Sequence, residues 1–121
     1  MGHNRDSQIN HRSSIMSTGY ATVPRELSEE IACKIVEERL AACVNIIECN
    51  SMYEWGGEIQ NVEESILIIK TSNEMFEEMV SRIKSLIPYE IPCIERFDED
   101  WTDEMFKKWR DGFVNGRKKE I

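Results

Sequence analysis

Apolar and polar residues follow one another along this chain with two periods, one typical of strands and one typical of helices. Segments rich in β-branched and aromatic residues predict strands at 19–23, 43–55, 58–71 and 93–97. Apolar residues at helical spacing predict helices over 27–42, after Thr71, and from Thr102 onward. This order of elements indicates an α+β fold. We expect a ferredoxin-like βαββαβ sandwich with helices on one face, a long central β-hairpin and an extra C-terminal helix.

The helical segments also carry signals for where they begin and end. Thr71, with Glu74 three residues later, fits a capping box, so the second helix is expected to start directly after Thr71. Thr102 is the expected N-cap of the last helix, and Gly116, followed by basic residues, is its expected end. The second helix carries a Met/Phe-rich stripe, for which core packing is a better interpretation than a cofactor site. Its members are Met75, Phe76, Met79, Val80, Ile83 and Leu86.

The two central strands are joined by Gly56-Gly57, a two-residue hairpin signal, because both positions tolerate a positive φ. The run 43–55 is longer than the ~5–6 residues of an ordinary strand, so the hairpin should project beyond the domain core. Projecting strand edges are either aggregation hazards or subunit contacts, and we favour subunit contacts. In the return strand the apolar run 66–69 does not alternate, which indicates a central strand buried on both faces.

The first seventeen residues differ from the rest of the chain. They are polar, show neither period and contain both histidines, His3 and His11. We therefore expect a disordered or non-native tail over 1–17, followed by a single domain over 18–121. Metal binding by the two tail histidines would say nothing about the domain.

Composition narrows the function classes. The chain has 121 residues and a formal net charge of −8. An acidic surface repels phosphate backbones and anionic lipid, so neither a nucleic-acid partner nor a membrane is expected. Apolar runs stay far below the ~20 residues that span a bilayer, and no signal-peptide pattern is recognisable, so we expect a cytoplasmic protein. Its four cysteines lack paired metal-site spacing and should be reduced, mostly buried thiols.

Few residues offer catalytic chemistry. The expected domain contains no histidine, which excludes Ser/His/Asp and Cys/His arrangements, and no phosphate-binding glycine loop is present. We therefore do not expect an enzyme. RNA-binding proteins use the same topology but stack bases on sheet aromatics. Here isoleucine and leucine occupy the central strand at 66–69, which argues against RNA binding.

Four segments carry a resemblance to a known family. The sequence EERLAACVN at 37–45 resembles the E-x-R-L-A-A-C-V-N segment of the CutA family of divalent-cation tolerance proteins. Residues 51–57 are similar to that family's S-x-Y-x-W-x-G hairpin, and 64–71 to its E-x-x-L-x-I-K-T strand. Residues 88–92 are similar to its H-P-Y-E-x-P turn without the histidine. The segments occur in the family's order and cover about 19–113.

The resemblance implies a homotrimer, related to the P-II signalling proteins, that is linked to tolerance of copper and other divalent cations. It places a metal thiol at Cys43 and a ligand cleft between subunits. The implied cleft residues are Tyr53, Trp55, Lys70, Tyr89 and Glu90.

Two positions depart from the family pattern: Ile87 stands where the family has histidine, and Cys93 where it has glutamate. Losing an imidazole and a carboxylate weakens a Cu(II) or Zn(II) site, whereas a second thiol favours Cu(I) if Cys43 and Cys93 converge. The candidate metal ligands are therefore Cys43, Cys93 and Glu90.

Structural roles compete with each of these assignments. Cys43 follows a helix and could belong to the core, and Tyr53 and Trp55 could serve trimer packing. Lys70 and Glu90 could pair with each other or with Glu64. At the level of function, the alternatives are a small-ligand-binding trimer resembling P-II proteins and a structural or anchoring trimer.

Overall fold

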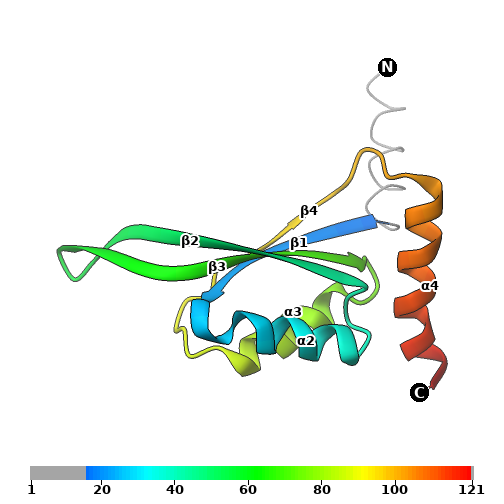
Figure 1. The fold of residues 1–121 in the computed structure, drawn as a ribbon, viewed down its shortest axis with the longest axis horizontal. Helices are drawn as coiled ribbons and strands as arrows, with labels where there is room; N and C mark the ends of the chain where they lie inside the picture. Colours follow the sequence, from blue (N-terminus) through cyan, green and yellow to red (C-terminus); the bar gives the residue numbers. More distant parts are fainter. Residues whose placement is uncertain (1–15, 121) are drawn as a thin grey trace.

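The computed structural model describes residues 16–120, with side chains for 17–116. Within this range one sheet contains four strands, β1 (Met16–Pro24), β2 (Cys43–Trp55), β3 (Glu58–Ser72) and β4 (Ile94–Phe97). A 3-10 turn, η1 (Arg25–Leu27), leads into α2 (Ser28–Glu37), and α3 (Phe76–Leu86) and α4 (Glu104–Glu120) follow later. The strand order is β2-β3-β1-β4, with every neighbouring pair antiparallel. The predicted α+β, ferredoxin-like arrangement is confirmed, and α2 and α3 cover the same face of the sheet (Figure 1).

The core lies between this sheet face and the two helices. Side chains that alternate along β1 and β3 point toward the helices, and Ala21, Val23, Leu67 and Ile69 are fully buried there. The helices contribute Ile31, Ile35, Met79 and Ile83, all buried, which matches their apolar stripes. The other face differs: Ile66 and Ile68 are only half-buried. The unbroken apolar run therefore does mark a central strand, but the single chain covers only one of its faces.

The hairpin is the most extended feature of the fold. Gly56 and Gly57 adopt φ values of +63° and +83°, as a tight hairpin turn requires. The last pair between β1 and β3 joins Pro24 to Glu64, so the six residues 58–63 of β3 continue beyond β1. At the usual rise this is a projection of about 20 Å, visible at the left of Figure 1.

Helix α4 stands across the opposite end of the sheet (Figure 1). Its Val114 is fully buried in the core. The guanidinium of Arg39 lies 4.6 Å from the ring centre of Phe113 and donates a hydrogen bond of 3.2 Å to the Phe113 carbonyl. No helix in the described range is long and apolar enough to cross a membrane.

A buried ion pair also ties α4 to the sheet. The side chain of Arg110 is fully buried, and its Nη1 donates to both carboxylate oxygens of Glu99, at 3.0 and 3.2 Å. Glu99 also accepts hydrogen bonds from Thr18 and Thr102. Burial alone would raise the pKa of Glu99, but these hydrogen bonds and the positive charge of Arg110 outweigh burial and lower it. Glu99 therefore stays ionised where it connects β1 to α4.

The first two helices are shorter than their patterns predicted. The first ends at Glu37 instead of Ala42, because Arg39 turns the chain with a φ of +59°. The predicted capping box is also wrong: Thr71 is a buried strand residue whose hydroxyl donates to the Leu40 carbonyl at 2.7 Å. Ser72 accepts the Met75 amide instead, and α3 begins at Phe76. A tertiary hydrogen bond thus outweighs the local capping signal.

Both predicted ends of the last helix need correction. Asp103, and not Thr102, caps it, because its Oδ2 accepts the amides of Met105 and Phe106. Thr102 is instead bonded to Glu99. At the other end, α4 continues past Gly116 to Glu120. The Arg39 side chain lies against the helix at Gly116, where a Cβ would be 2.9 Å from the Arg39 Nη1. Glycine at this position therefore leaves room for the guanidinium.

Glu99→Gln should lower the free energy of unfolding at pH 7 by about 2 kcal/mol, because charged hydrogen bonds to Arg110 and two threonines are weakened. Since the folded pKa of Glu99 is lowered, its stabilisation is present above the unfolded pKa of about 4.3 and is lost as pH falls through the folded value. Urea unfolding at pH 7 and in the acid range measures both effects.

The control is Asp98→Asn, which removes the same charge from an exposed neighbour. Asp98→Asn should unfold like the wild-type protein at both pH values. If Glu99→Gln keeps the full acid sensitivity of the wild type, the proposed role of Glu99 is wrong.

Candidate functional site

The loop between α3 and β4 brings Tyr89 to the base of the hairpin. Pro88 and Pro92 bracket this segment, which bends at Glu90 and Ile91. The Tyr89 hydroxyl donates a hydrogen bond of 2.5 Å to Oε2 of Glu64. Glu64 is only 7% exposed, so this hydrogen bond satisfies a carboxylate that is nearly withdrawn from water. Burial first, and then the bond to Glu64 and its charge, raise the pKa of Tyr89 well above its usual value.

Arg25 fixes the backbone beside this pair. Its Nη2 donates to the Cys49 carbonyl at 2.6 Å and its Nε to the Glu64 carbonyl at 3.3 Å. Cys49 and Glu64 are direct partners in the β2–β3 ladder, so one guanidinium holds both strands where the hairpin leaves the sheet. The backbone of Glu64 is therefore held by hydrogen bonds from Arg25 as well as by the β2–β3 ladder.

Further polar groups share this sheet face. Directly paired residues of an antiparallel sheet point to the same side, which places Tyr20 with Glu95 and Cys49 with Glu64. Burial, followed by the electrostatic influence of Cys93, Cys49, Glu95 and Glu64, raises the pKa of Tyr20. The predicted residues Tyr89, Glu90 and Cys93, together with Glu64, are called the hairpin-side group below; Glu90 and Cys93 are exposed.

Two other predicted residues lie at the far end of the same face. Cys43 and Lys70 are direct partners at the start of β2, and Lys70 also pairs with Thr18. Both side chains are half-buried. We call Cys43 and Lys70 the α4-side group, because Thr18 is hydrogen-bonded to Glu99, the anchor of α4.

The sheet register keeps these two groups apart within one chain. Glu64 and Lys70 are six residues apart on β3, which is about 20 Å, so the predicted Lys70–Glu64 pair does not form within the chain. Cys93 lies next to Thr22, since its carbonyl accepts the Thr22 amide at 3.2 Å. Cys43 is aligned with Thr18, four residues along β1 from Thr22, and β2 is three strand positions from β4 in the sheet. The two thiols are therefore far apart within one chain.

Tyr53 and Trp55 are on the projecting part of β2 and are both exposed. They point to the face that carries Glu64, and Tyr53 contributes to the raised pKa of Tyr89. The hairpin thus brings Tyr53 toward the Tyr89–Glu64 pair, whereas Trp55 lies farther out beside the turn.

The described residues hold no cluster of three or more Cys, Asp, Glu or His side chains that could bind a metal ion. The described cysteines are free thiols, but the prediction that they are mostly buried is wrong: Cys33 and Cys93 are exposed, and Cys43 and Cys49 are half-buried. A metal site made of the predicted ligands therefore needs donors from more than one chain. Sequence reasoning named Glu64 only as a possible ion-pair partner and did not single out Tyr20 or Cys49. The alternation of side chains along the two strands could have predicted that Glu64 and Cys49 share a face. It could not have predicted the hydrogen bond from Tyr89 to Glu64.

The four-stranded antiparallel sheet, with two helices on one face and a projecting hairpin, makes this chain a small ferredoxin-like α+β protein. The family model described as CutA1 divalent ion tolerance protein matches residues 17–112. The chain therefore belongs to the CutA1 family.

Individual relatives agree with this assignment. The divalent-cation tolerance protein CutA of Pyrococcus horikoshii is 40% identical over 91 residues, which cover 74% of this chain and 89% of that protein. Protein CutA of Homo sapiens is 38% identical over 106 residues, covering 86% of this chain and 59% of that one. Among solved structures, the PII-like protein CutA from Nostoc sp. PCC 7120 in apo form has a TM-score of 0.78 at 32% identity, covering 82% and 97% of the two chains.

Tyr89→Phe tests the hydrogen bond at the centre of this site. Removing the hydroxyl leaves Glu64 without its donor and should lower the free energy of unfolding by about 1–3 kcal/mol at neutral pH. Because the folded pKa of Tyr89 is raised, its contribution is present below the unfolded pKa of about 10 and disappears as pH rises through the folded value. Urea unfolding at pH 7 and above pH 10 measures the difference.

Tyr53→Phe is the matched control, since Tyr53 is exposed and its loss should change stability little. Equal effects of the two substitutions would show that the Tyr89–Glu64 bond has no special role. A double variant with Glu64→Gln should lose less than the sum of the single losses.

Proposed function

We propose that this CutA1-family protein acts as a homotrimer that binds copper or another divalent cation between its subunits, and that it is not an enzyme. The observation that carries the proposal is the division of the candidate ligands into two groups at opposite ends of one sheet. Neither group alone contains all the candidate metal ligands. The paired strands keep the two ends of the sheet apart within one chain.

Two copies arranged head to tail would solve this problem. The hairpin projects from one end of the sheet, and Cys43 and Lys70 lie at the other (Figure 1). A contact between unlike ends is heterologous, and it closes into a ring when the rotation between copies allows it. In a ring of three, the hairpin-side group of each subunit would face the α4-side group of the next.

The open sheet face supports assembly independently. Ile47 and Phe97 are about half exposed, and Ile66 and Ile68 between them are only half-buried. Contiguous apolar surface of this kind is uncommon on a monomer and is typical of subunit interfaces. Packing the sheets of three subunits against one another would remove it from water.

The donor set favours a soft ion. Cys43 and Cys93 supply thiolates, the ligands that select Cu(I), and Glu90 adds an exposed carboxylate. A reducing, cytoplasmic environment would keep these thiols available. The assignment of copper rests on this chemistry.

A small organic ligand is the second candidate. It is favoured by the hydroxyls of Tyr53 and Tyr89 near a buried carboxylate, since such groups can fix the orientation of a polar molecule. It would occupy the same inter-subunit position, with Lys70 of the neighbouring copy available for an anionic group.

A complementation experiment tests the site directly. His3→Gln and His11→Gln remove the tail imidazoles from every protein used. Anaerobic loading with Cu(I) and native mass spectrometry should then show trimers with bound copper, lost in Cys43→Ser and in Cys93→Ser. When the two single variants are co-expressed, mixed trimers should regain about one site, because one interface again has both thiols.

Cys33→Ser is the control, because Cys33 is an exposed thiol on α2, far from either group, and should not change copper binding. Recovery of no copper in mixed trimers would rule out a site shared between subunits. Trimers that stay empty in the wild type would favour the small-ligand candidate, and a monomer would refute the proposal.

A further inference from the structure

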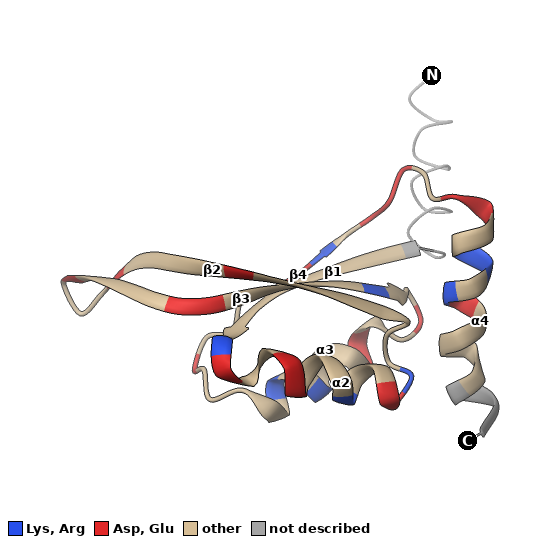
Figure 2. Ribbon diagram, in the orientation of Figure 1, with Lys and Arg blue, Asp and Glu red and all other residues tan. Residues whose placement is uncertain are grey.

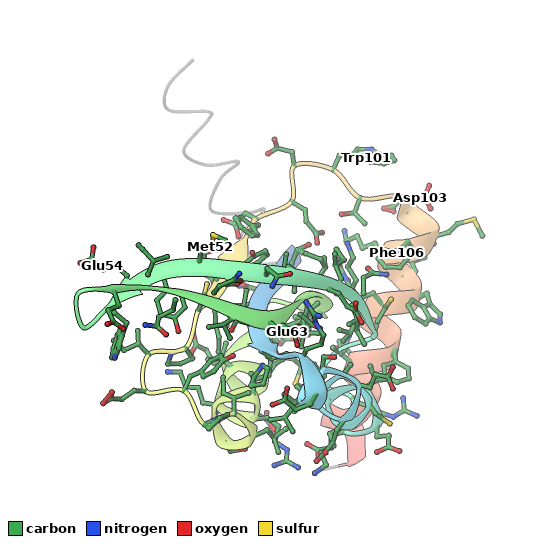
Figure 3. The ribbon with its side chains drawn as sticks, turned by 60° about the vertical axis from the view of Figure 1, so that its left-hand side comes forward. Met52, Glu54, Glu63, Trp101, Asp103 and Phe106 are labelled. Atoms are coloured by element: carbon green, nitrogen blue, oxygen red, sulfur yellow. The ribbon has the colours of Figure 1, made fainter. Side chains whose placement is uncertain are left out.

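The outer side of α4 is apolar although it faces solvent. Met105 is 80% exposed and Trp109 51%, and the exposed Gly112 continues the same side, because residues four and seven positions apart share one side of a helix. Trp101, in the turn that leads into the helix, is 79% exposed (Figure 3). We call these four residues the α4 stripe. Tryptophan and methionine are enriched in protein interfaces, so such a surface is typical of a contact with another protein.

The aromatic part of the stripe is held in a fixed position. The Trp109 ring stacks on the Phe113 ring, with 6.2 Å between the ring centres, and lies 5.7 Å from the centre of the Phe106 ring. The guanidinium of Arg39 covers Phe113 and ends this row of rings. A partner therefore meets a preformed surface that loses little side-chain entropy on binding.

Gly112 is the unusual member of the stripe. Its backbone is helical, so no positive φ requires glycine there. A Cβ built at Gly112 would meet nothing within 4 Å among the described residues, so packing inside the subunit does not require glycine either. Glycine weakens a helix relative to alanine, because it loses more backbone entropy on folding. Close approach of another molecule at this point explains the missing side chain.

The stripe is complementary to itself when two copies of α4 run antiparallel. The two-fold axis that places Met105 of one copy opposite Gly112 of the other also places the reciprocal pair together. A large side chain then fills the space left by a missing one, twice in the same contact. This register also brings Trp101 to the far end of the other helix, where the Arg39 guanidinium lies against Gly116. An arginine over an indole ring is a favourable contact.

Charge favours the antiparallel arrangement as well. The start of α4 is acidic, with Asp103 and Glu104 exposed there (Figure 2). Its other end is basic, because Arg39 lies against it and the sequence continues with Arg117-Lys118-Lys119. Antiparallel copies bring the unlike ends together, whereas parallel copies would bring like ends together.

We propose that the α4 stripe binds the α4 stripe of a second copy of this chain, as an antiparallel pair. The contact is isologous and goes beyond the proposed ring of three, since it joins two trimers into a hexamer. Covering the exposed parts of Trp101, Met105 and Trp109 would remove roughly 450 Å² of apolar surface per copy from water. Standard stable interfaces bury about 800 Å² per partner, so the pairing should be reversible and concentration-dependent.

Exchanging the sizes of the two paired residues tests this contact in the full-length chain. Met105→Ala leaves a gap and Gly112→Met creates a collision, so each should raise the dissociation constant of the pairing step about 10-fold or more. The double variant again places a large side chain opposite a small one and should return to within about 3-fold of the wild type. Sedimentation equilibrium under reducing conditions without metal, up to about 1 mM chain, measures this constant.

Two further variants separate pairing from folding. Gly112→Ala should raise the midpoint of thermal unfolding at low protein concentration, because alanine is the better helix former and its Cβ meets nothing within the described subunit. The same variant should weaken pairing. Ser81→Met adds a large exposed side chain to α3 and should leave the dissociation constant unchanged.

The unit that doubles in size tests the proposed function separately. A trimer that becomes a hexamer agrees with both proposals, and a monomer that becomes a dimer contradicts the trimer alone. A wild-type chain that does not double, or size-exchange variants without mutual rescue, would overturn the α4 pair. Loss of the trimer itself in Met105→Ala would place the stripe inside the ring and would also overturn the α4 pair.

Discussion

The register of the β2–β3 hairpin is the constraint on which the rest of this structure depends. Gly56 and Gly57 set the turn, and thirteen ladder pairs then run from Trp55–Glu58 to Cys43–Lys70. If β3 shifted by one residue along β2, its two faces would be exchanged. Leu67 and Ile69 would leave the core, and Glu64 would turn away from Tyr89. The buried core on one face and the polar site on the other therefore follow from a single alignment.

That alignment also separates the functional candidates. Glu64 and Lys70 belong to one strand and one face, yet lie about 20 Å apart, and the other predicted ligands divide between these two positions. The sheet is too stiff and too well paired to bring its ends together. Assembly of several copies is the simplest way to complete a site, and it would also cover the exposed hairpin and the open sheet face. The family to which the chain belongs is described by divalent ion tolerance. The proposed inter-subunit site names residues that could bind such an ion.

Much of the fold could be predicted from the sequence because its signals were periodic and long. The β-branched and aromatic residues of 43–55, the Gly56-Gly57 turn and the apolar faces of the first two helices required no tertiary information. The failures occurred at helix ends, where tertiary contacts compete with local signals: Thr71 bonds to Leu40 instead of capping a helix, and Arg39 ends α2 early.

The candidate site was harder to predict. Motifs identified Tyr89 and Cys43, but the partner of Tyr89 depends on a contact across 25 residues, and the distance between the thiols depends on the strand order. Neither is visible in a local pattern. Arg110 shows the same limitation: no sequence pattern distinguishes it from the other charges of the last helix, yet it is fully buried against Glu99.

The most direct test of the central claim joins two chains through their own cysteines. One chain retains only Cys43 and the other only Cys93, with the remaining cysteines changed to serine, and the two are co-expressed and treated with a short thiol–thiol crosslinker. The account predicts a covalent dimer that contains one chain of each kind, and little product from either chain alone. Intact trimers that give no such dimer would show that the two ends of neighbouring subunits do not meet.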